Sequence, residues 1–185
     1  MSRRITILGA GESGTGAALL AAKKGFTVFV SDAGTIKPSY KEKIQQVGIQ
    51  FEEGGHSENK VLQTDLIIKS PGISDKSEII KKAGALRIPV IDEIEFAFEF
   101  ISGKVIAITG TNGKTTTSLM IKKVLEENGF NVLLNDSGAN LVNGIVSAFI
   151  KNSSWLGKNE TDFGVFEIDE NSLPLVLRSE EHTSE

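Results

Sequence analysis

The sequence predicts an α/β fold with parallel sheets, arranged as two domains. Short β-rich runs alternate with helical stretches along the chain, which is typical of strand–helix–strand units. Two of these runs, ending at Leu8 and Ile108, lead directly into glycine-containing loops that are followed by helical sequence. The length of 185 residues is enough for one large or two small domains.

The first domain is predicted over residues 1–103. Its strands are expected at residues 5–8, 27–30, 49–51, 65–68 and 89–91. Helical sequence follows at residues 17–24, 79–86 and 93–100. Gly84 and Gly103 are interpreted as residues that end helices. This alternation predicts one parallel sheet covered by helices.

The second domain is predicted over residues 104–177, with strands at 105–108, 131–134 and 163–168 and helices at 115–128 and 144–150. Within residues 115–128, four apolar side chains share one face, which predicts an amphipathic helix packed on a core: Met120, Ile121, Val124 and Leu125. Three strands make a small sheet, so we expect an incomplete domain.

Composition excludes several classes of protein. Twenty Lys and Arg against 24 Asp and Glu give a net charge of −4, so neither nucleic acid nor an anionic membrane surface is an expected partner. The absence of cysteine excludes disulfides and thiolate metal sites. The sequence has no apolar run of about 18 residues and no signal-peptide core, which predicts a cytoplasmic protein.

The last eight residues, 178–185, are polar and aperiodic. They read like the translation of a sequencing-library adapter, so we expect a non-native tail, the alternative being an ordinary disordered terminus. His182 lies in this segment and is given no role. The other histidine, His56, is expected to be a solvated loop residue, and Trp155 a loop anchor.

The segment from Ile108 to Thr117 carries the strongest chemical signal. A strand runs into the loop Gly-Thr-Asn-Gly and then into Lys114 and Thr115, which open a helix. Backbone N–H groups of such a loop wrap phosphate oxygens, Lys114 can reach β- and γ-phosphates, and Thr115 can bind Mg²⁺. Ile108 occupies the place of the first glycine of the usual pattern, so this is a shortened P-loop. The alternative is a glycine-rich turn with an incidental lysine.

A second glycine loop, Gly9–Gly14, follows the strand at residues 5–8 and predicts a Rossmann-like domain in which backbone approaches a diphosphate. Asp32 ends the next strand, where its carboxylate can accept hydrogen bonds from ribose hydroxyls. The alternative is a tight turn in which Asp32 merely caps the strand end.

Two further segments lie at predicted strand ends. Lys69–Ile73 follows the strand at residues 65–68, at the edge where α/β sheets bind ligands, although a plain Pro-Gly turn is an equal alternative. Glu167 ends the strand at residues 163–168 and is predicted to bind Mg²⁺ beside the phosphate loop. Asp169 and Glu170 are equally compatible with a metal site and with a solvated acidic loop.

Four segments together resemble the Mur ligases of peptidoglycan synthesis: Gly9–Gly14, Lys69–Ile73, Ile91–Glu95 and Thr109–Thr116. The resemblance implies a Rossmann-like domain for a uridine diphosphate substrate, a central ATPase domain and a C-terminal domain for the incoming amino acid. It implies that ATP, with Mg²⁺, phosphorylates the substrate carboxylate and that an amine attacks the acyl phosphate.

Matching motif positions carries the family's site residues onto this chain. The implied contacts to the UDP substrate are Gly11, Glu12, Ser13, Gly14, Asp32, Ser70, Pro71 and Gly72. The implied ATP-binding residues are Gly110, Thr111, Asn112, Gly113, Lys114, Thr115 and Thr116. Lys114 is the implied catalytic residue, and the implied Mg²⁺ ligands are Thr115 and Glu167.

Residues 1 to about 120 most resemble the MurD branch, which adds D-glutamate to UDP-N-acetylmuramoyl-L-alanine. Residues from about 118 to 177 look more like the MurT branch, the ligase-like subunit of lipid II isoglutaminyl synthase, which works with a glutaminase subunit. The chain is therefore either a chimera joined near Thr117 or a divergent natural sequence. The family's carbamylated lysine and amino-acid domain would lie beyond residue 177, so we expect nucleotide binding without completed ligation.

Two alternatives of other classes remain at this level. One is an NAD-dependent oxidoreductase built on residues 1–100, and the other is a nucleotide-binding regulatory module without catalysis. Lys114 and its hydroxyl neighbours argue against the oxidoreductase, because a dehydrogenase has no use for a second phosphate loop.

Overall fold

The computed structural model describes residues 2–100, 103–135 and 161–168. The chain divides into two compact units, Met1–Phe96 and Ala97–Glu185. Both units are α/β, and both contain a parallel sheet, as the sequence predicts. Within the described ranges, none of the helices has the length and apolar character needed to cross a membrane.

The first unit alternates strands and helices. Its strands are β1 (Arg4–Leu8), β2 (Thr27–Asp32), β3 (Gln50–Glu53), β4 (Leu66–Lys69) and β5 (Val90–Asp92). Its helices are α1 (Glu12–Lys23), α2 (Pro38–Gln46), α3 (Glu58–Val61) and α4 (Glu78–Ala85), and α5 (Glu93–Phe98) begins in this unit.

The five strands form one sheet in the order β3-β2-β1-β4-β5, and every neighbouring pair is parallel. From β1 the chain builds outward through β2 to β3, then returns to the other side of β1 with β4 and β5. The order therefore reverses beside β1, which is where doubly wound sheets bind ligands.

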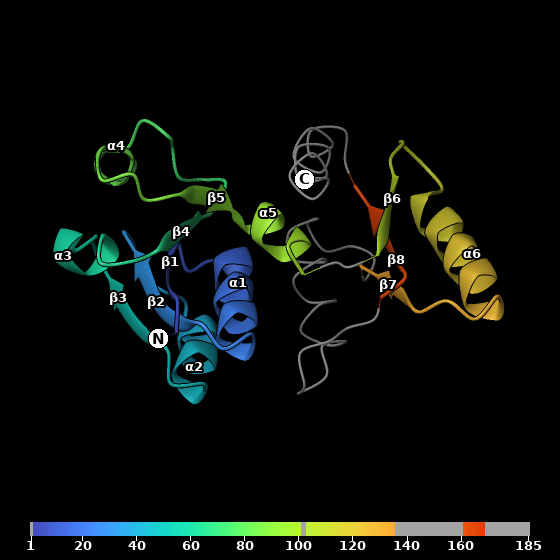
Figure 1. Cartoon of the computed structure of the whole chain (residues 1–185), viewed down its shortest axis with the longest axis horizontal. Helices are drawn as coiled ribbons and strands as arrows, with labels where there is room; N and C mark the ends of the chain where they lie inside the picture. Colours follow the sequence, from blue (N-terminus) through green and yellow to red (C-terminus); the bar gives the residue numbers. More distant parts are fainter. Residues whose placement is uncertain (1, 101–102, 136–160, 169–185) are drawn as a thin grey trace. The chain divides into compact units, whose positions relative to one another are not determined.

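Helices cover both faces of this sheet (Figure 1): α1 and α2 lie on one face, and α3 and α4 on the other. Burial on both faces explains the continuous apolar strands. On the α3 and α4 face, a core forms from Leu8, Phe29, Val61, Ile67, Ile79 and Ala83. On the other face, α1 buries small side chains such as Ala17, Ala18 and Ala21, which let the helix pack closely on the strands.

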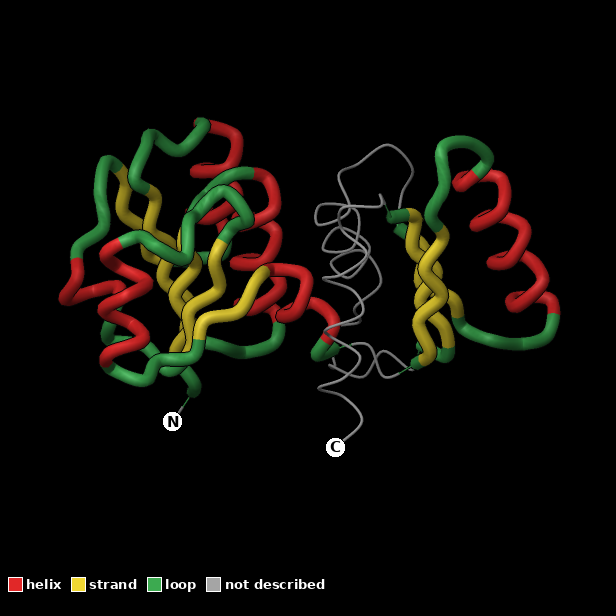
Figure 2. The backbone as a smooth tube through the Cα atoms, turned by 90° about the horizontal axis from the view of Figure 1, so that it is seen from above, coloured by secondary structure: helices red, strands yellow, loops and turns green. Residues whose placement is uncertain are grey.

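The second unit contains β6 (Lys104–Ile108), α6 (Lys114–Glu127), β7 (Val132–Leu134) and β8 (Phe163–Glu167). These strands form a parallel sheet in the order β6-β8-β7, and the α6 helix packs on one of its faces (Figure 2). The register pairs Ile108 with Glu167, so the strand ends that carry the phosphate loop and the predicted metal ligand are adjacent.

Every strand predicted from the sequence is present within two or three residues of its expected bounds. Helices α2 and α3 were not predicted, because their sequences are too polar to show a clear apolar period. Gly84 lies inside α4 rather than at its end. Gly103 has a packing role, since a Cβ on it would lie 2.2 Å from the carbonyl oxygen of Thr161.

Two of the four apolar side chains that share a face of the α6 helix are exposed, Met120 by 65% and Val124 by 59%. In the described part of the chain, three strands lie beside this helix of 14 residues, and they cover only part of its apolar face. The predicted helix at 144–150, Trp155, Asp169, Glu170 and the tail at 178–185 lie outside the described residues.

Among the glycines of the first unit, Gly14 leaves the least room for a side chain. A Cβ added there would lie 2.0 Å from the carbonyl oxygen of Gly9, which belongs to the loop that enters α1. No side chain fits at that separation, so the glycine fixes the close packing of the α1 helix against the end of β1.

We predict that Gly14→Ala lowers the free energy of unfolding by about 2–4 kcal/mol, because either the loop at Gly9 or the α1 helix must shift to make room for the methyl group. Gly84→Ala is the matched control: its added Cβ meets no atom within 4 Å, and alanine is the better helix former, so a gain of about 0.5–1 kcal/mol is expected. Urea unfolding followed by circular dichroism measures both. Equal effects for the two variants would contradict the packing role of Gly14.

Candidate functional site

The loops that follow β1 and β4 lie against each other. The backbone N–H of Ser70 donates to the carbonyl of Leu8 over 2.9 Å, and a Cβ on Gly9 would lie 2.7 Å from the hydroxyl oxygen of Ser70. The structure thus brings together the two segments that the sequence predicts for the UDP substrate, Gly11–Gly14 and Ser70–Gly72. Glu12, Pro71 and Gly72 are exposed at this edge of the sheet.

Asp32 ties the end of β2 to this edge. Its Oδ2 accepts the backbone N–H of Ala10 over 2.6 Å, and its Oδ1 accepts that of Gly34 over 2.7 Å. The carboxylate therefore braces the glycine loop, which is the strand-capping role that the sequence left open. Each oxygen retains a lone pair, so the predicted contact to a ribose stays a prediction.

Glu93 connects the two loops through hydrogen bonds to a side chain of each. It is fully buried at the start of α5, and its Oε1 accepts the hydroxyl of Ser13 over 3.1 Å and that of Ser70 over 2.5 Å. Its Oε2 is buried without a hydrogen-bond partner. A single carboxyl oxygen thus holds one side chain from each loop.

Burial is the largest cause that raises the pKa of Glu93, and the nearby charge of Asp92 adds to it. The hydrogen bonds from Ser70 and Ser13 lower the pKa and offset these effects only in part, which leaves it at about 7. Glu93 therefore holds a proton more readily than an exposed glutamate does.

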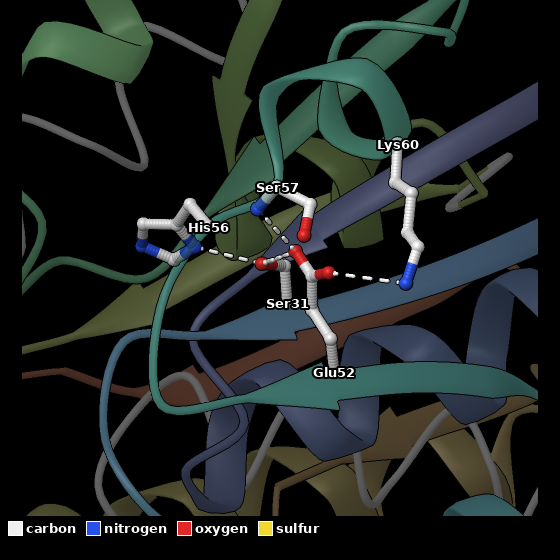
Figure 3. A network of polar contacts seen from close by, with 5 residues as sticks. All are labelled: Ser31, Glu52, His56, Ser57 and Lys60. Carbon is white, nitrogen blue, oxygen red and sulfur yellow. Dashed lines mark hydrogen bonds and ion pairs between the residues drawn. The ribbon is translucent and has the colours of Figure 1, made fainter.

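A polar network closes the ends of β2 and β3 (Figure 3). Ser31 is fully buried, and its hydroxyl lies 2.8 Å from Glu52 Oε1 and 2.7 Å from His56 Nδ1. Burial raises the pKa of Glu52, but hydrogen bonds from Ser57 and Ser31 and the charge of Lys60 outweigh it and lower the pKa overall. A buried serine is no nucleophile for a substrate, so this network is structural, and His56 is not merely solvated.

The second group of predicted site residues lies in the second unit, at the carboxyl ends of its strands, where the loop after β6 enters α6. Gly113 has φ +79°, the left-handed conformation that favours glycine, and it precedes the first helical residue, Lys114. The ammonium of Lys114 donates to the carbonyl of Gly110 and so folds over the loop. The first N–H groups of a helix have no partner within it and face outward, which suits an anion.

Glu167 meets the start of α6. Its Oε2 accepts the hydroxyl of Thr115 over 2.9 Å, and its Oε1 lies 2.8 Å from the hydroxyl of Ser118. Its backbone is fixed by Asn135, whose side chain bonds both its N–H and its carbonyl. The structure brings the two predicted metal ligands into contact, and oxygen donors of this kind fit Mg²⁺.

Neither of these two sites, as far as the structure describes them, holds a cluster of ionisable side chains that could bind a metal by themselves. In the described part of the chain, no group of three or more His, Cys, Asp or Glu side chains is placed to hold a metal. Mg²⁺ bound by Thr115 and Glu167 would take its remaining ligands from phosphate oxygens and water, which is its usual mode of binding.

Two family models match this chain. Residues 4–79 match the MurD N-terminal domain, and residues 108–183 match the Mur ligase middle domain. The chain therefore belongs to the Mur ligase family.

Among curated relatives, the chain is 52% identical over 134 residues to UDP-N-acetylmuramoylalanine–D-glutamate ligase of Cytophaga hutchinsonii, which is 71% of this chain and 30% of that protein. It is 48% identical over 130 residues to the ligase of the same name from Bacteroides fragilis, covering 70% and 29%. The chain thus spans about 30% of the length of the curated relatives it matches.

Solved structures give the same fold. A murein peptide ligase from Psychrobacter arcticus superposes with a TM-score of 0.61 at 29% identity, over 92% of this chain and 38% of that one. UDP-N-acetylmuramate–alanine ligase from Thermotoga maritima superposes with a TM-score of 0.57 at 23% identity, over 91% and 37%. Both support the Rossmann-like reading of the first domain.

Sequence reasoning missed Glu93 and Ser118. Glu93 lies in the segment Ile91–Glu95, which was noted for its resemblance but given no role. A signal for it was present: two consecutive acidic residues, Asp92 and Glu93, directly follow a predicted strand and precede the apolar residue Ile94, at the strand ends where ligands bind. Ser118 is one helical turn from Thr115, so its side chain lies on the same face of α6.

We predict that the stability of the chain falls as pH rises from about 5 to 8, relative to Glu93→Gln. The folded pKa of about 7 exceeds the ordinary value of 4.5 for a glutamate, so the folded chain binds more protons in this window, and raising the pH costs it about 2–3 kcal/mol. Urea unfolding of both proteins at several pH values gives the difference. A difference that does not change with pH would contradict the burial of an ionisable carboxyl here.

Proposed function

We propose that this chain comprises the UDP-substrate domain and part of the ATP-binding domain of a ligase that adds D-glutamate to UDP-N-acetylmuramoyl-L-alanine. The observation that carries the proposal is the convergence of Ser13 and Ser70 on Glu93, which joins the glycine loop and the Ser-Pro-Gly loop at the point where the strand order reverses. The relatives named for this reaction, at about 50% identity, support it.

The first domain would hold the uridine diphosphate part of the substrate. The loop after β1 offers backbone N–H groups at the start of α1, and Ser13 and Ser70 add hydroxyls from either side. Asp32 braces the loop through Ala10, and its carboxylate would accept hydrogen bonds from the ribose hydroxyls of such a ligand. These groups bind and orient the substrate, and none of them takes part in chemistry.

The second domain would hold ATP and Mg²⁺. ATP supplies the phosphoryl group that activates the substrate carboxylate for attack by the amine of D-glutamate. Lys114 and the N–H groups at the start of the α6 helix offset the negative charge of the phosphates, and Thr115 and Glu167 supply oxygens for the metal. The chain spans about 30% of its curated relatives, so the full reaction is proposed for the whole enzyme.

The alternative assignment for the second half is the MurT-like subunit of lipid II isoglutaminyl synthase, with a glutaminase partner. The two assignments share the phosphate loop and the pairing of Thr115 with Glu167, so both expect ATP. They differ in the first domain, because only the MurD-like assignment expects binding of UDP-N-acetylmuramoyl-L-alanine there. An NAD-dependent oxidoreductase would instead bind NADH and ignore both ligands.

We predict that the chain binds UDP-N-acetylmuramoyl-L-alanine and that Ser70→Ala weakens binding about 10- to 100-fold, since one hydrogen bond to a charged group is lost. Ser39→Ala, at an exposed position on α2, is the control and should keep full affinity. Calorimetric titration measures both. Binding of NADH in place of the uridine nucleotide would overturn the assignment to the ligase family's reaction.

We also predict that the chain binds Mg²⁺-ATP and that Lys114→Ala weakens this binding at least 10-fold, because the phosphates lose their cation. Lys123→Ala is the matched control: Lys123 lies on the same helix, and its side chain is 78% exposed. Equilibrium binding of a fluorescent ATP analogue compares the variants. Equal affinities would show that the loop before α6 is not a phosphate site.

A further inference from the structure

The carboxyl group of Glu93 controls where two hydroxyl hydrogens point. Ser13 lies on α1 and Ser70 follows β4, and both donate to the same oxygen, Oε1. Glu93 is 0% exposed, and its second oxygen, Oε2, has no hydrogen-bond partner. A buried carboxylate with an unused oxygen is costly, so this arrangement is balanced between an ionised and a protonated form.

Counting hydrogens shows why this matters for a phosphate ligand. A serine hydroxyl has one hydrogen, and here both hydrogens point to Glu93, which leaves only lone pairs for a ligand that binds at the two loops. Phosphate oxygens of a nucleotide diphosphate are acceptors, so lone pairs of Ser13 and Ser70 would repel them. The two hydroxyls can donate to the ligand only when they no longer donate to Glu93.

This inference rests on the proposed function and deepens it. We propose that Glu93 takes up one proton from solvent when the diphosphate of a uridine nucleotide binds at the loops after β1 and β4, which frees the hydroxyls of Ser13 and Ser70 to donate to phosphate oxygens. No covalent bond other than the new O–H of Glu93 forms. Glu93 thereby acts as a positioning residue that works through the two serines.

The charge of Asp92, which directly precedes Glu93 at the end of β5, favours this uptake. The cation on the neighbouring strand end, Lys69, is bound to Asp75 over 3.1 Å. Burial and the charge of Asp92 already raise the pKa of Glu93 to about 7, and a bound diphosphate adds negative charge that raises it further.

The test is calorimetric titration of the whole chain with UDP-N-acetylmuramoyl-L-alanine in buffers of different ionisation enthalpy. The diphosphate diester and the carboxylate of this probe do not titrate near neutral pH, so any proton taken up goes to the protein. From a pKa of about 7 in the free chain, we expect uptake of roughly half a proton per ligand at pH 7, rising toward one at pH 8.

Glu93→Gln should bind the probe with no proton uptake and with an affinity that does not change between pH 6 and 8. Glu42→Gln is the control, since it removes an equal charge from an exposed position on α2 and should keep the uptake. Uptake that persists in Glu93→Gln would assign the proton to another group, such as His56, and would overturn the inference.

A second measurement covers the case in which Glu93→Gln does not fold. In the unaltered chain, a carbon-13 NMR titration should show one side-chain carboxyl with a midpoint near 7 that moves above 8 when the probe is bound. Binding of the probe without this shift and without proton uptake would overturn the inference and leave the proposed function intact. No binding of the probe at any pH would overturn both.

Discussion

Parallel pairing with a reversal of strand order beside β1 is the constraint on which the first domain depends. Parallel strands place all their carboxyl ends at one edge, and the reversal sends the loops after β1 and β4 to opposite sides of the same point. Three features bring these loops into contact: Gly14, which has no Cβ, the hydroxyl of Ser70, and Glu93, which accepts hydrogen bonds from Ser13 and Ser70.

Parallel pairing also brings together, in the second domain, site residues that are distant in sequence. Thr115 and Glu167 are 52 positions apart, yet they form a hydrogen bond because β6 and β8 are neighbours and Ile108 pairs with Glu167. A carboxylate held beside the first turn of a helix, next to a loop that presents N–H groups, combines oxygen ligands for a cation with donors for an anion. That combination suits a metal-bound polyphosphate, and neither part alone would.

Much of this could be predicted from the sequence, because local patterns encode strands and glycine loops directly. The run at Ile5–Leu8 followed by Gly9–Gly14 predicts a strand that leads through a tight turn into a helix. The loop ending at Lys114 predicts a phosphate loop. Glu93 could not be assigned in this way, since its role depends on Ser13 and Ser70, which only the strand order brings together. The exposure of Met120 and Val124 could not be predicted either, because it depends on how the described strands β6, β8 and β7 cover α6.

The central claim is that the loops after β1 and β4 form the ligand site, and amide NMR tests it most directly. Adding UDP-N-acetylmuramoyl-L-alanine to nitrogen-15-labelled chain should shift the amide signals of Gly9–Gly14, Ser70 and Gly72. Signals at the opposite edge of the sheet, such as those of Gly48 and Gln50, should stay in place. Shifts confined to that opposite edge, or no shifts at all, would contradict the account.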